Sequence, residues 1–412
     1  GCYNNAFGRG ALGSNTTGNY NNAIGYLALY GNTTGGSNFA VGTSALVGAL
    51  SGGHNVAIGS NALKSNWGGS DNFAVGYISM CANTTGRDNN AFGSYTMCGN
   101  TTGYQNNAIG KSALKNNTTG TDNQAIGANA LAGNTTGGSN QAIGYGALIC
   151  NTTGHYNNAI GREALHSNTT GCHNTALGQN ALRTSLSGCH NFAAGQCALY
   201  TNCGGGCNTS IGKNALFGNT TASHNNALGC GALRSNTTGD RNNAIGLNAL
   251  YNNTTGCNNN ALGSYPLYYN TTGIYNNAIG DNALHRNTTG SYNEALGLNA
   301  LSRNTEGCHN QAIGRDALRS NTTGCYNAAI GQNALYCSTE GCHNNAIGCG
   351  ALFYNTTGEY NTAIGTRALY TSLSGDHNFA AGQCALYSNW GGTYNTAIGC
   401  GALKSNTTGY NN

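Results

Sequence analysis

One motif recurs every seventeen residues along the whole chain, without a single insertion or deletion. We number the unit from the Asn of the sequence NTTG, so that Asn15 holds position 1, Gly18 position 4 and Asn21 position 7. Residues that share one position form a column. The numbering runs unbroken from Gly1 to Asn412 and gives about 24 units. One extra residue would shift every later position, so this regularity predicts a fold that stacks identical units.

The abundance of Gly and Asn is also typical of a disordered low-complexity tract. The columns argue against that alternative. Column 7 is Asn and column 11 is Gly in every unit, and charged residues never occur in columns 1, 2, 4, 7, 9, 10, 11, 14 or 15. A disordered segment has no reason to exclude charge from fixed positions. We interpret these nine columns as the interior and the corners of a folded repeat.

Seventeen residues are too few for a helix-pair repeat, and Gly, Asn and Thr are poor helix formers. A short strand, a glycine corner, a second short strand and another corner would form one turn of a solenoid. We therefore expect an all-β fold, a parallel β-solenoid (β-roll) of about 24 coils with seventeen residues per coil. We expect one uninterrupted array over residues 1–412, as a fragment of a longer repeat region.

Three columns predict structural roles: columns 7 and 11, which are invariant, and column 4, which is Gly in every unit except for Ala222. The glycines of columns 4 and 11 are expected at sharp corners with positive φ. The Asn column is expected to form an amide ladder, with each side chain bonded to its copies in the next coils; a simple turn role for Asn is the alternative. The predicted corners include Gly8, Gly25, Gly42 and Gly59, and the predicted ladder includes Asn4, Asn21, Asn38, Asn55, Asn72, Asn89 and Asn106.

Columns 9–10 and 14–15 are neighbouring pairs, Ala-Ile and Ala-Leu in most units. Neighbours on a strand point to opposite faces. If Ile24 and Leu29 fill the coil, then Ala23 and Ala28 form uncharged outer stripes against which another chain could pack. The alternative is that one residue of each pair sits at a corner and that both point inward.

One coil departs from the pattern in three columns at once. Leu186 enlarges column 2 and Phe192 enlarges column 8, while Ala194 shrinks column 10. The same exchange recurs 11 coils later. Because a packed interior keeps its total volume, we expect columns 2 and 10 to meet in the core, where the Phe of column 8 either joins them or covers them from outside. The predicted core residues are Ile24, Leu29, Leu186, Phe192, Leu373 and Phe379.

The motif N-x-A-I-G-x-x-A-L, as in NNAIGYLAL (21–29) and NTAIGTRAL (361–369), resembles the head repeats of YadA-like trimeric autotransporter adhesins. Similar repeats occur in bacterial and phage-type tail fibres. The resemblance implies a parallel β-roll, three identical chains packed together, and an extracellular adhesive or spacer role. This chain departs from the family in its longer unit, with an added NTT segment, and in its 18 cysteines.

Several cysteines share a column in adjacent coils, where a separation of about 4.8 Å suits a disulfide. We expect disulfide bonds between coils or between chains, with free thiols as the alternative. The GCHN pairs, such as Cys172-His173, could offer zinc ligands, but the recurrent Tyr and His of column 6 favour an aromatic surface ladder. The candidate disulfide residues are Cys172, Cys189, Cys308, Cys325, Cys342, Cys81 and Cys98.

The segment N-T-T matches the acceptor pattern for N-glycosylation, although Asn also suits a corner. Regular Thr on a solenoid is in addition typical of ice-binding proteins. Column 2 also takes Leu, Trp and Cys, so we expect the first Thr to face an apolar space and only the second to face solvent. The candidate glycosylation sites are Asn15, Asn32, Asn83, Asn100, Asn117 and Asn134.

Only 7% of the residues are charged, against about 25% in a typical soluble domain, and the formal net charge is +4. So small a net charge forms no basic patch, which argues against a nucleic-acid partner. No run of about 20 apolar residues occurs, so we expect no membrane span. No column pairs a nucleophile with a base, so we expect no enzyme, no cofactor and no metal.

We expect a structural or spacer component of an extracellular fibre or cell-surface filament, a homo-oligomer that associates through its Ala faces. An adhesin or tail-fibre shaft that binds a receptor or glycan through the Tyr/His ladder is the alternative. An ice-binding solenoid is a weaker third hypothesis.

Overall fold

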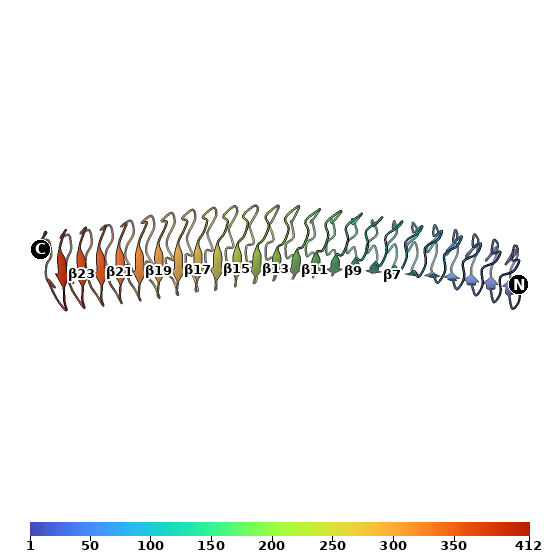
Figure 1. Ribbon diagram of the computed structural model, residues 1–412, viewed down its shortest axis with the longest axis horizontal. Coiled ribbons are helices and arrows are strands. Elements are labelled where there is room, and N and C mark those ends of the chain that lie inside the picture. The colour runs from blue at the N-terminus through green and yellow to red at the C-terminus, as the bar shows by residue number, and fades with distance from the viewer. The chain divides into compact units, whose positions relative to one another are not determined.

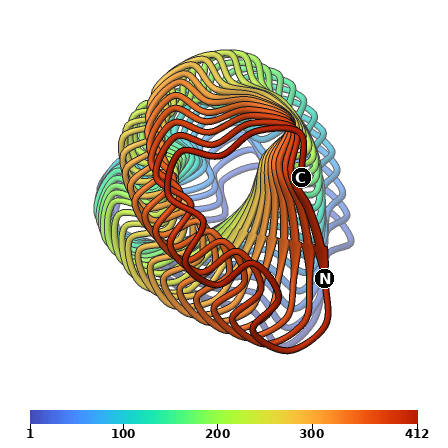
Figure 2. The same ribbon diagram turned by 90° about the vertical axis from the view of Figure 1, so that its left-hand side faces the viewer.

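The computed structural model describes all residues, 1–412, and shows an all-β chain that winds as a parallel β-solenoid (Figure 1). The residues divide into two compact units, Gly1–Cys207 and Asn208–Asn412, and each is described by itself. Each unit contains twelve strands. Figure 2 looks along the stack and shows that the coils within a unit repeat one outline.

Every strand occupies columns 8–10 of its coil and is three residues long. The first unit contains β1 (Asn5–Phe7), β2 (Asn22–Ile24), β3 (Phe39–Val41), β4 (Val56–Ile58), β5 (Phe73–Val75), β6 (Asn90–Phe92), β7 (Asn107–Ile109), β8 (Gln124–Ile126), β9 (Gln141–Ile143), β10 (Asn158–Ile160), β11 (Thr175–Leu177) and β12 (Phe192–Ala194). The second contains β13 (Thr209–Ile211), β14 (Asn226–Leu228), β15 (Asn243–Ile245), β16 (Asn260–Leu262), β17 (Asn277–Ile279), β18 (Glu294–Leu296), β19 (Gln311–Ile313), β20 (Ala328–Ile330), β21 (Asn345–Ile347), β22 (Thr362–Ile364), β23 (Phe379–Ala381) and β24 (Thr396–Ile398).

Within each unit every strand pairs in parallel with the next strand along the chain, and paired residues are one repeat apart. In β7 and β8, for example, Ala108 lies opposite Ala125 and Ile109 opposite Ile126. Each column of the sequence is therefore a physical row of stacked residues. A residue type that repeats at this spacing contacts its own copies.

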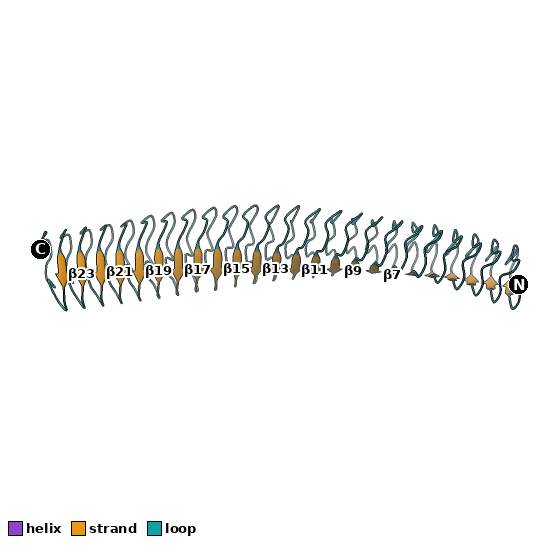
Figure 3. Cartoon of the chain, viewed as in Figure 1, coloured by secondary structure: helices purple, strands orange, loops and turns teal.

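The expected second strand of each coil is absent, and Figure 3 shows one strand per coil with loops elsewhere. Columns 14 and 15 lie in a run of turns, in which Leu29 adopts a φ of 51° and Leu114 a φ of 50°. This left-handed backbone breaks the alternation of a strand. As a result the Ala and the Leu of the pair both point inward, which is the alternative considered for these columns.

The expected outward Ala stripes are also wrong, because Ala23, Ala28 and Leu29 are fully buried. Ile24 is the outward residue of its pair, with 45% of its surface exposed. In β2 the flanking residues of columns 8 and 10 point out and the central Ala points in. The interior of the coil is therefore built from the Ala of columns 9 and 14, the Leu of column 15 and the Asn of columns 1 and 7.

The predicted volume exchange inside the core is wrong for the same reason. Leu186 is 46% exposed, and Phe192, Leu373 and Phe379 are exposed as well. Columns 2, 8 and 10 face outward, so these large side chains do not meet in the interior. Of the predicted core residues, only Leu29 lies there.

The glycines of column 11 adopt positive φ angles, 133° at Gly8 and Gly25, 130° at Gly42 and 131° at Gly59. A Cβ on Gly25 would in addition lie 2.6 Å from the carbonyl oxygen of Gly42 in the next coil. Both facts exclude a side chain at this corner. The column 4 glycines do not adopt positive φ, which corrects the expectation for them.

The burial pattern makes a prediction that separates the two apolar columns. Leu114→Ala removes a fully buried side chain and should lower the free energy of unfolding by about 2–5 kcal/mol. Ile109→Ala, in the same coil, removes a side chain that is 42% exposed, and at a protein concentration at which the chain is monomeric it should cost less than about 1 kcal/mol. Chemical denaturation of both variants checks this, and an equal cost for the two would contradict the assigned core.

Candidate functional site: asparagine ladders and outward columns

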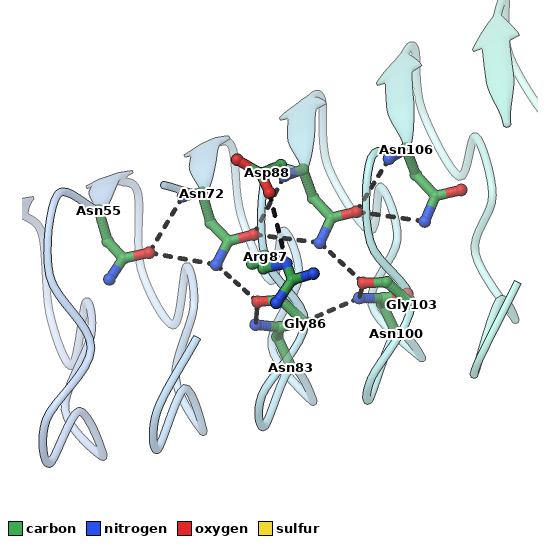
Figure 4. Close-up of polar contacts among 10 residues, drawn as sticks. Asn55, Asn72, Asn83, Gly86, Arg87, Asp88, Asn100, Gly103 and Asn106 are labelled. Atoms are coloured by element: carbon green, nitrogen blue, oxygen red, sulfur yellow. Dashed lines mark hydrogen bonds and ion pairs between the residues drawn. The ribbon is translucent and has the colours of Figure 1, made fainter. Parts of the chain in front are cut away.

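The column 7 asparagines form a continuous ladder within each unit (Figure 4). The Oδ1 of Asn55 accepts both the backbone N–H and the side-chain amide of Asn72, each at 3.1 Å. The Oδ1 of Asn72 accepts the same two donors from Asn89. The predicted residues at the start of the chain join through the backbone, since Asn21 N–H donates to Asn4 Oδ1 at 2.9 Å and Asn38 N–H to Asn21 Oδ1 at 3.0 Å.

A second ladder, which the sequence interpretation missed, runs along column 1. Asn83 Nδ2 donates to Asn66 Oδ1 at 2.7 Å, and Asn100 Nδ2 donates to Asn83 Oδ1 at 2.8 Å. These side chains are fully buried. The sequence feature that could have revealed this ladder is the absence of charged residues from column 1. That absence indicates an interior position rather than an exposed glycosylation site.

The carbonyl of the column 4 glycine joins the two ladders. The oxygen of Gly86 accepts from Asn72 Nδ2 at 2.8 Å and from Asn83 Nδ2 at 3.0 Å (Figure 4). A Cβ on Gly86 would collide with the side chain of Asn83 and with the carbonyl of Gly103. The ladders therefore crowd column 4 and favour Gly there, whereas its φ angle does not require Gly; Ala222 is the one exception.

Four coils interrupt the column 1 ladder with a residue other than Asn. The side-chain oxygens of Asn32, Asn168, Asn321 and Asn355 are buried without a partner, and each stands one coil before an interruption. A ladder oxygen accepts from the Asn of the next coil, so a missing Asn leaves it unpaired. The hydroxyls of Ser185, Ser338 and Ser372, which replace Asn in three of these coils, are unpaired as well.

Repair of one interruption should stabilise the chain. Ser338→Asn would give Asn321 Oδ1 a donor and would offer an acceptor to Asn355 Nδ2, so we expect a gain of about 1–3 kcal/mol in the free energy of unfolding. Ser338→Ala is the matched control, because it removes the unpaired hydroxyl without supplying an amide. Chemical denaturation of both variants tests the ladder, and a gain no larger in Ser338→Asn than in the control would argue against it.

The same geometry corrects the glycosylation prediction. Asn32, Asn83, Asn100, Asn117 and Asn134 are fully buried, and the Nδ2 of each donates to the column 4 glycine carbonyl at 2.9–3.0 Å. Asn15 is half-buried and makes the same bond at 3.0 Å. A sugar on Nδ2 would displace these hydrogen bonds and would need space that the interior lacks. The folded coil therefore does not accommodate glycans at these residues.

The two Thr columns differ as expected in exposure. The hydroxyl of Thr84 in column 2 donates to the carbonyl of Thr101 in the next coil at 3.0 Å, and Thr85 in column 3 is exposed. Column 2 nevertheless lies at the surface, since Trp67 in that column is 56% exposed. Its hydroxyls are used between coils, so column 3 alone offers free Thr hydroxyl groups outward.

Column 6 forms a stack of aromatic rings in the second unit. Neighbouring ring centroids are 4.8–5.1 Å apart, and the ring planes lie within 19° of parallel. Each inner ring is covered on both faces by its neighbours, so the ladder offers edges, phenol hydroxyls and imidazole nitrogens rather than ring faces. The stack consists of Tyr275, Tyr292, His309, Tyr326, His343, Tyr360, His377 and Tyr394.

Column 10 forms an apolar stripe on the outside of each unit. It contains Ile, Leu, Val, Phe or Ala in every coil, never a polar or charged residue. Many of these side chains are exposed by more than a third, among them Ile109, Ile126, Leu228 and Leu262. Column 8 lies beside it on the same face of the strands and accepts Asn, Gln, Thr and even Glu294.

Side-chain volume is balanced between these two outward columns. Wherever column 8 is Phe, column 10 of the same strand has a smaller side chain, Val or Ala. In all other coils column 10 is Ile, Leu or Phe. A solvated surface does not require such compensation, whereas a surface in contact with another does. The compensated pairs are Phe39 with Val41, Phe73 with Val75, Phe192 with Ala194, and Phe379 with Ala381.

The candidate disulfide residues lie in adjacent coils as expected, and all of them are free thiols in the structure. The sulfurs of Cys308 and Cys325 are 2.9 Å apart, and the sulfur of Cys342 accepts the N–H of Cys325 at 3.2 Å. The sulfur of Cys189 likewise accepts the N–H of Cys172 at 3.1 Å. Disulfide formation at these residues stays a prediction.

No protein-family model matches the sequence, and no curated protein matches it. The chain forms no helix that could span a lipid bilayer.

Proposed function

We propose that the chain is a structural component of an extracellular fibre or surface filament and that it associates with copies of itself. The contact surface is the outward face of strands β1–β12 and β13–β24, which consists of columns 8 and 10. This assignment replaces the Ala stripes, which are buried. The observation that carries the proposal is the apolar, half-exposed column 10, which is free of polar residues in every coil.

Four observations support this proposal. Contiguous apolar surface larger than a few hundred Å² is uncommon on soluble monomers and marks an interaction site. The volume balance between columns 8 and 10 fits a flat surface in contact with a partner. The repetition of that surface at every coil suits a second copy of this chain, which presents the same spacing. The resemblance of the N-x-A-I-G-x-x-A-L motif to adhesin head repeats supports the extracellular setting.

The adhesin alternative receives less support from column 6. Sugars commonly stack on the faces of aromatic rings, and in this ladder the neighbouring rings cover those faces. The self-association proposal, by contrast, uses side chains that are exposed.

The proposal predicts how charge on column 10 changes the assembly. In light scattering, the triple variant Ile109→Lys, Ile126→Lys and Ile143→Lys should shift the mass from that of an oligomer to that of a single chain, because it buries charge in the contact. The control places Lys at Thr102, Thr119 and Thr136, which lie in column 3 of the same three coils. Column 3 already accepts Glu306 and Glu340, so this variant should assemble as the wild type does.

A wild-type protein that has the mass of one chain in solution would refute the proposal, as would a triple Ile variant that assembles like the control. Circular dichroism of each variant verifies that the fold is retained.

A further inference from the structure

We propose that Cys81 and Cys98 form a redox site, at which a small-molecule disulfide oxidises the two thiols to a bond between adjacent coils. Both residues hold column 16 and both are half-buried. In four consecutive coils this column reads Lys64, Cys81, Cys98 and Lys115. Two nucleophilic side chains thus stack directly between two ammonium groups, a combination that the structural role does not require.

The backbone places the two sulfurs within reach of each other. The N–H of Ser65 donates to the carbonyl of Cys81 at 3.0 Å, and the N–H of Ala82 donates to the carbonyl of Cys98 at 3.1 Å. These bonds hold the coils at a spacing of about 4.8 Å, inside the Cα range of roughly 4.4–6.8 Å that a disulfide accepts. The Cys81 thiol already points to the next coil, since its sulfur lies 3.4 Å from the carbonyl oxygen of Cys98.

Electrostatics divides the roles between the two sulfurs. A hydrogen bond from the Cys81 thiol, aided by the positive charge of Lys115, lowers the pKa of Cys98 to about 7 although burial opposes the shift. The same hydrogen bond, with burial and the negative charge on Cys98, raises the pKa of Cys81, and Lys64 opposes this. The carboxyl groups of these coils, Asp71 and Asp88, lie in column 6. The two thiols therefore titrate as a coupled pair that shares one proton, and the charge of Lys115 favours the negative charge on Cys98.

The reaction consists of two exchanges. The Cys98 thiolate attacks one sulfur of the small disulfide, forms a mixed disulfide and releases one small thiolate. Cys81 then loses its proton and attacks the sulfur of Cys98, which forms the bond between Cys81 and Cys98 and releases the second small thiolate. Two protein thiols are oxidised, and one small disulfide is reduced to two thiols.

The Cys308 and Cys325 pair provides an internal comparison. Its sulfurs are only 2.9 Å apart, but burial and the hydrogen bond to Cys325 raise the pKa of Cys308 to about 11, and no basic residue contributes to that pKa. If proximity alone decided reactivity, this pair would oxidise at least as fast as Cys81 and Cys98.

The test measures alkylation of the full chain by iodoacetamide as a function of pH, with mass spectrometry of tryptic peptides. Trypsin separates Cys81, in peptide 65–87, from Cys98, in peptide 88–111. The rate at Cys98 should reach half of its maximum near pH 7, against about pH 8.5 for an ordinary cysteine. With oxidised glutathione at pH 7, the linked peptides 65–87 and 88–111 should appear before a link between 304–315 and 320–367.

Three variants separate the contributions of Lys115 and Cys81 to the reactivity of the Cys98 thiol. Lys115→Gln should slow alkylation of Cys98 at pH 7 by roughly two- to fivefold, whereas Lys111→Gln, an equal charge change in column 12, should not. Cys81→Ala should move the half-maximal pH of Cys98 toward about 8.5 and should leave glutathione attached to Cys98.

The wild-type profile alone can overturn the proposal, so it does not depend on a variant that folds. Half-maximal alkylation of Cys98 above pH 8, or earlier linkage of the 304–315 and 320–367 peptides, would refute it. Equal slowing by Lys115→Gln and Lys111→Gln would refute the role of column 16. None of these outcomes bears on the oligomeric state, which tests the proposed function separately.

Discussion

The coil depends on one shared acceptor, the carbonyl oxygen of the glycine in column 4. At Gly86 this oxygen binds the amides of Asn72 and Asn83, which belong to different ladders and to adjacent coils. The contact ties the corner of one coil to the coil before it, and it repeats along each unit. A buried amide without partners would cost several kcal/mol, so hydrogen bonding explains the Asn of columns 1 and 7. Gly prevails in column 4 because a Cβ there would collide with the ladder. The apolar interior around them is thin and consists mainly of Ala and of one Leu or Met per coil.

This stacking also explains how the chain tolerates an unusual backbone. Columns 6, 13 and 15 adopt positive φ, at residues such as Tyr292, Asn299 and Leu301. A non-glycine residue in that region costs about 1–3 kcal/mol. The hydrogen bonds from coil to coil offset this strain, and they do so only when neighbours are present. The left-handed backbone conformation of Leu301 allows two successive side chains, Ala300 and Leu301, to point into the interior.

Because every column is a row in space, a repeated residue type becomes a chemical feature. Aromatic residues in column 6 become a ring stack, and apolar residues in column 10 become a stripe. The two cysteines of column 16 become neighbouring thiols between two lysines. Most of this was accessible from the sequence once the period was known. The outward direction of column 10 was also accessible, since column 8 accepts Glu294 and a strand alternates, so columns 8 and 10 must share a face.

The sequence by itself determined the period, the parallel solenoid, the column 7 ladder and the adjacency of the cysteines, because strict repetition fixes which residues stack. It did not determine the direction of the Ala-Leu pair. That depends on the left-handed φ of Leu29, which no column pattern reveals. Only the tertiary structure showed that both side chains of that pair point inward, and that the column 1 amides bond to one another from coil to coil. The interior of each coil holds the Ala of columns 9 and 14 and one Leu or Met of column 15, and because side chains alternate along the strand, Ile24 lies at the surface.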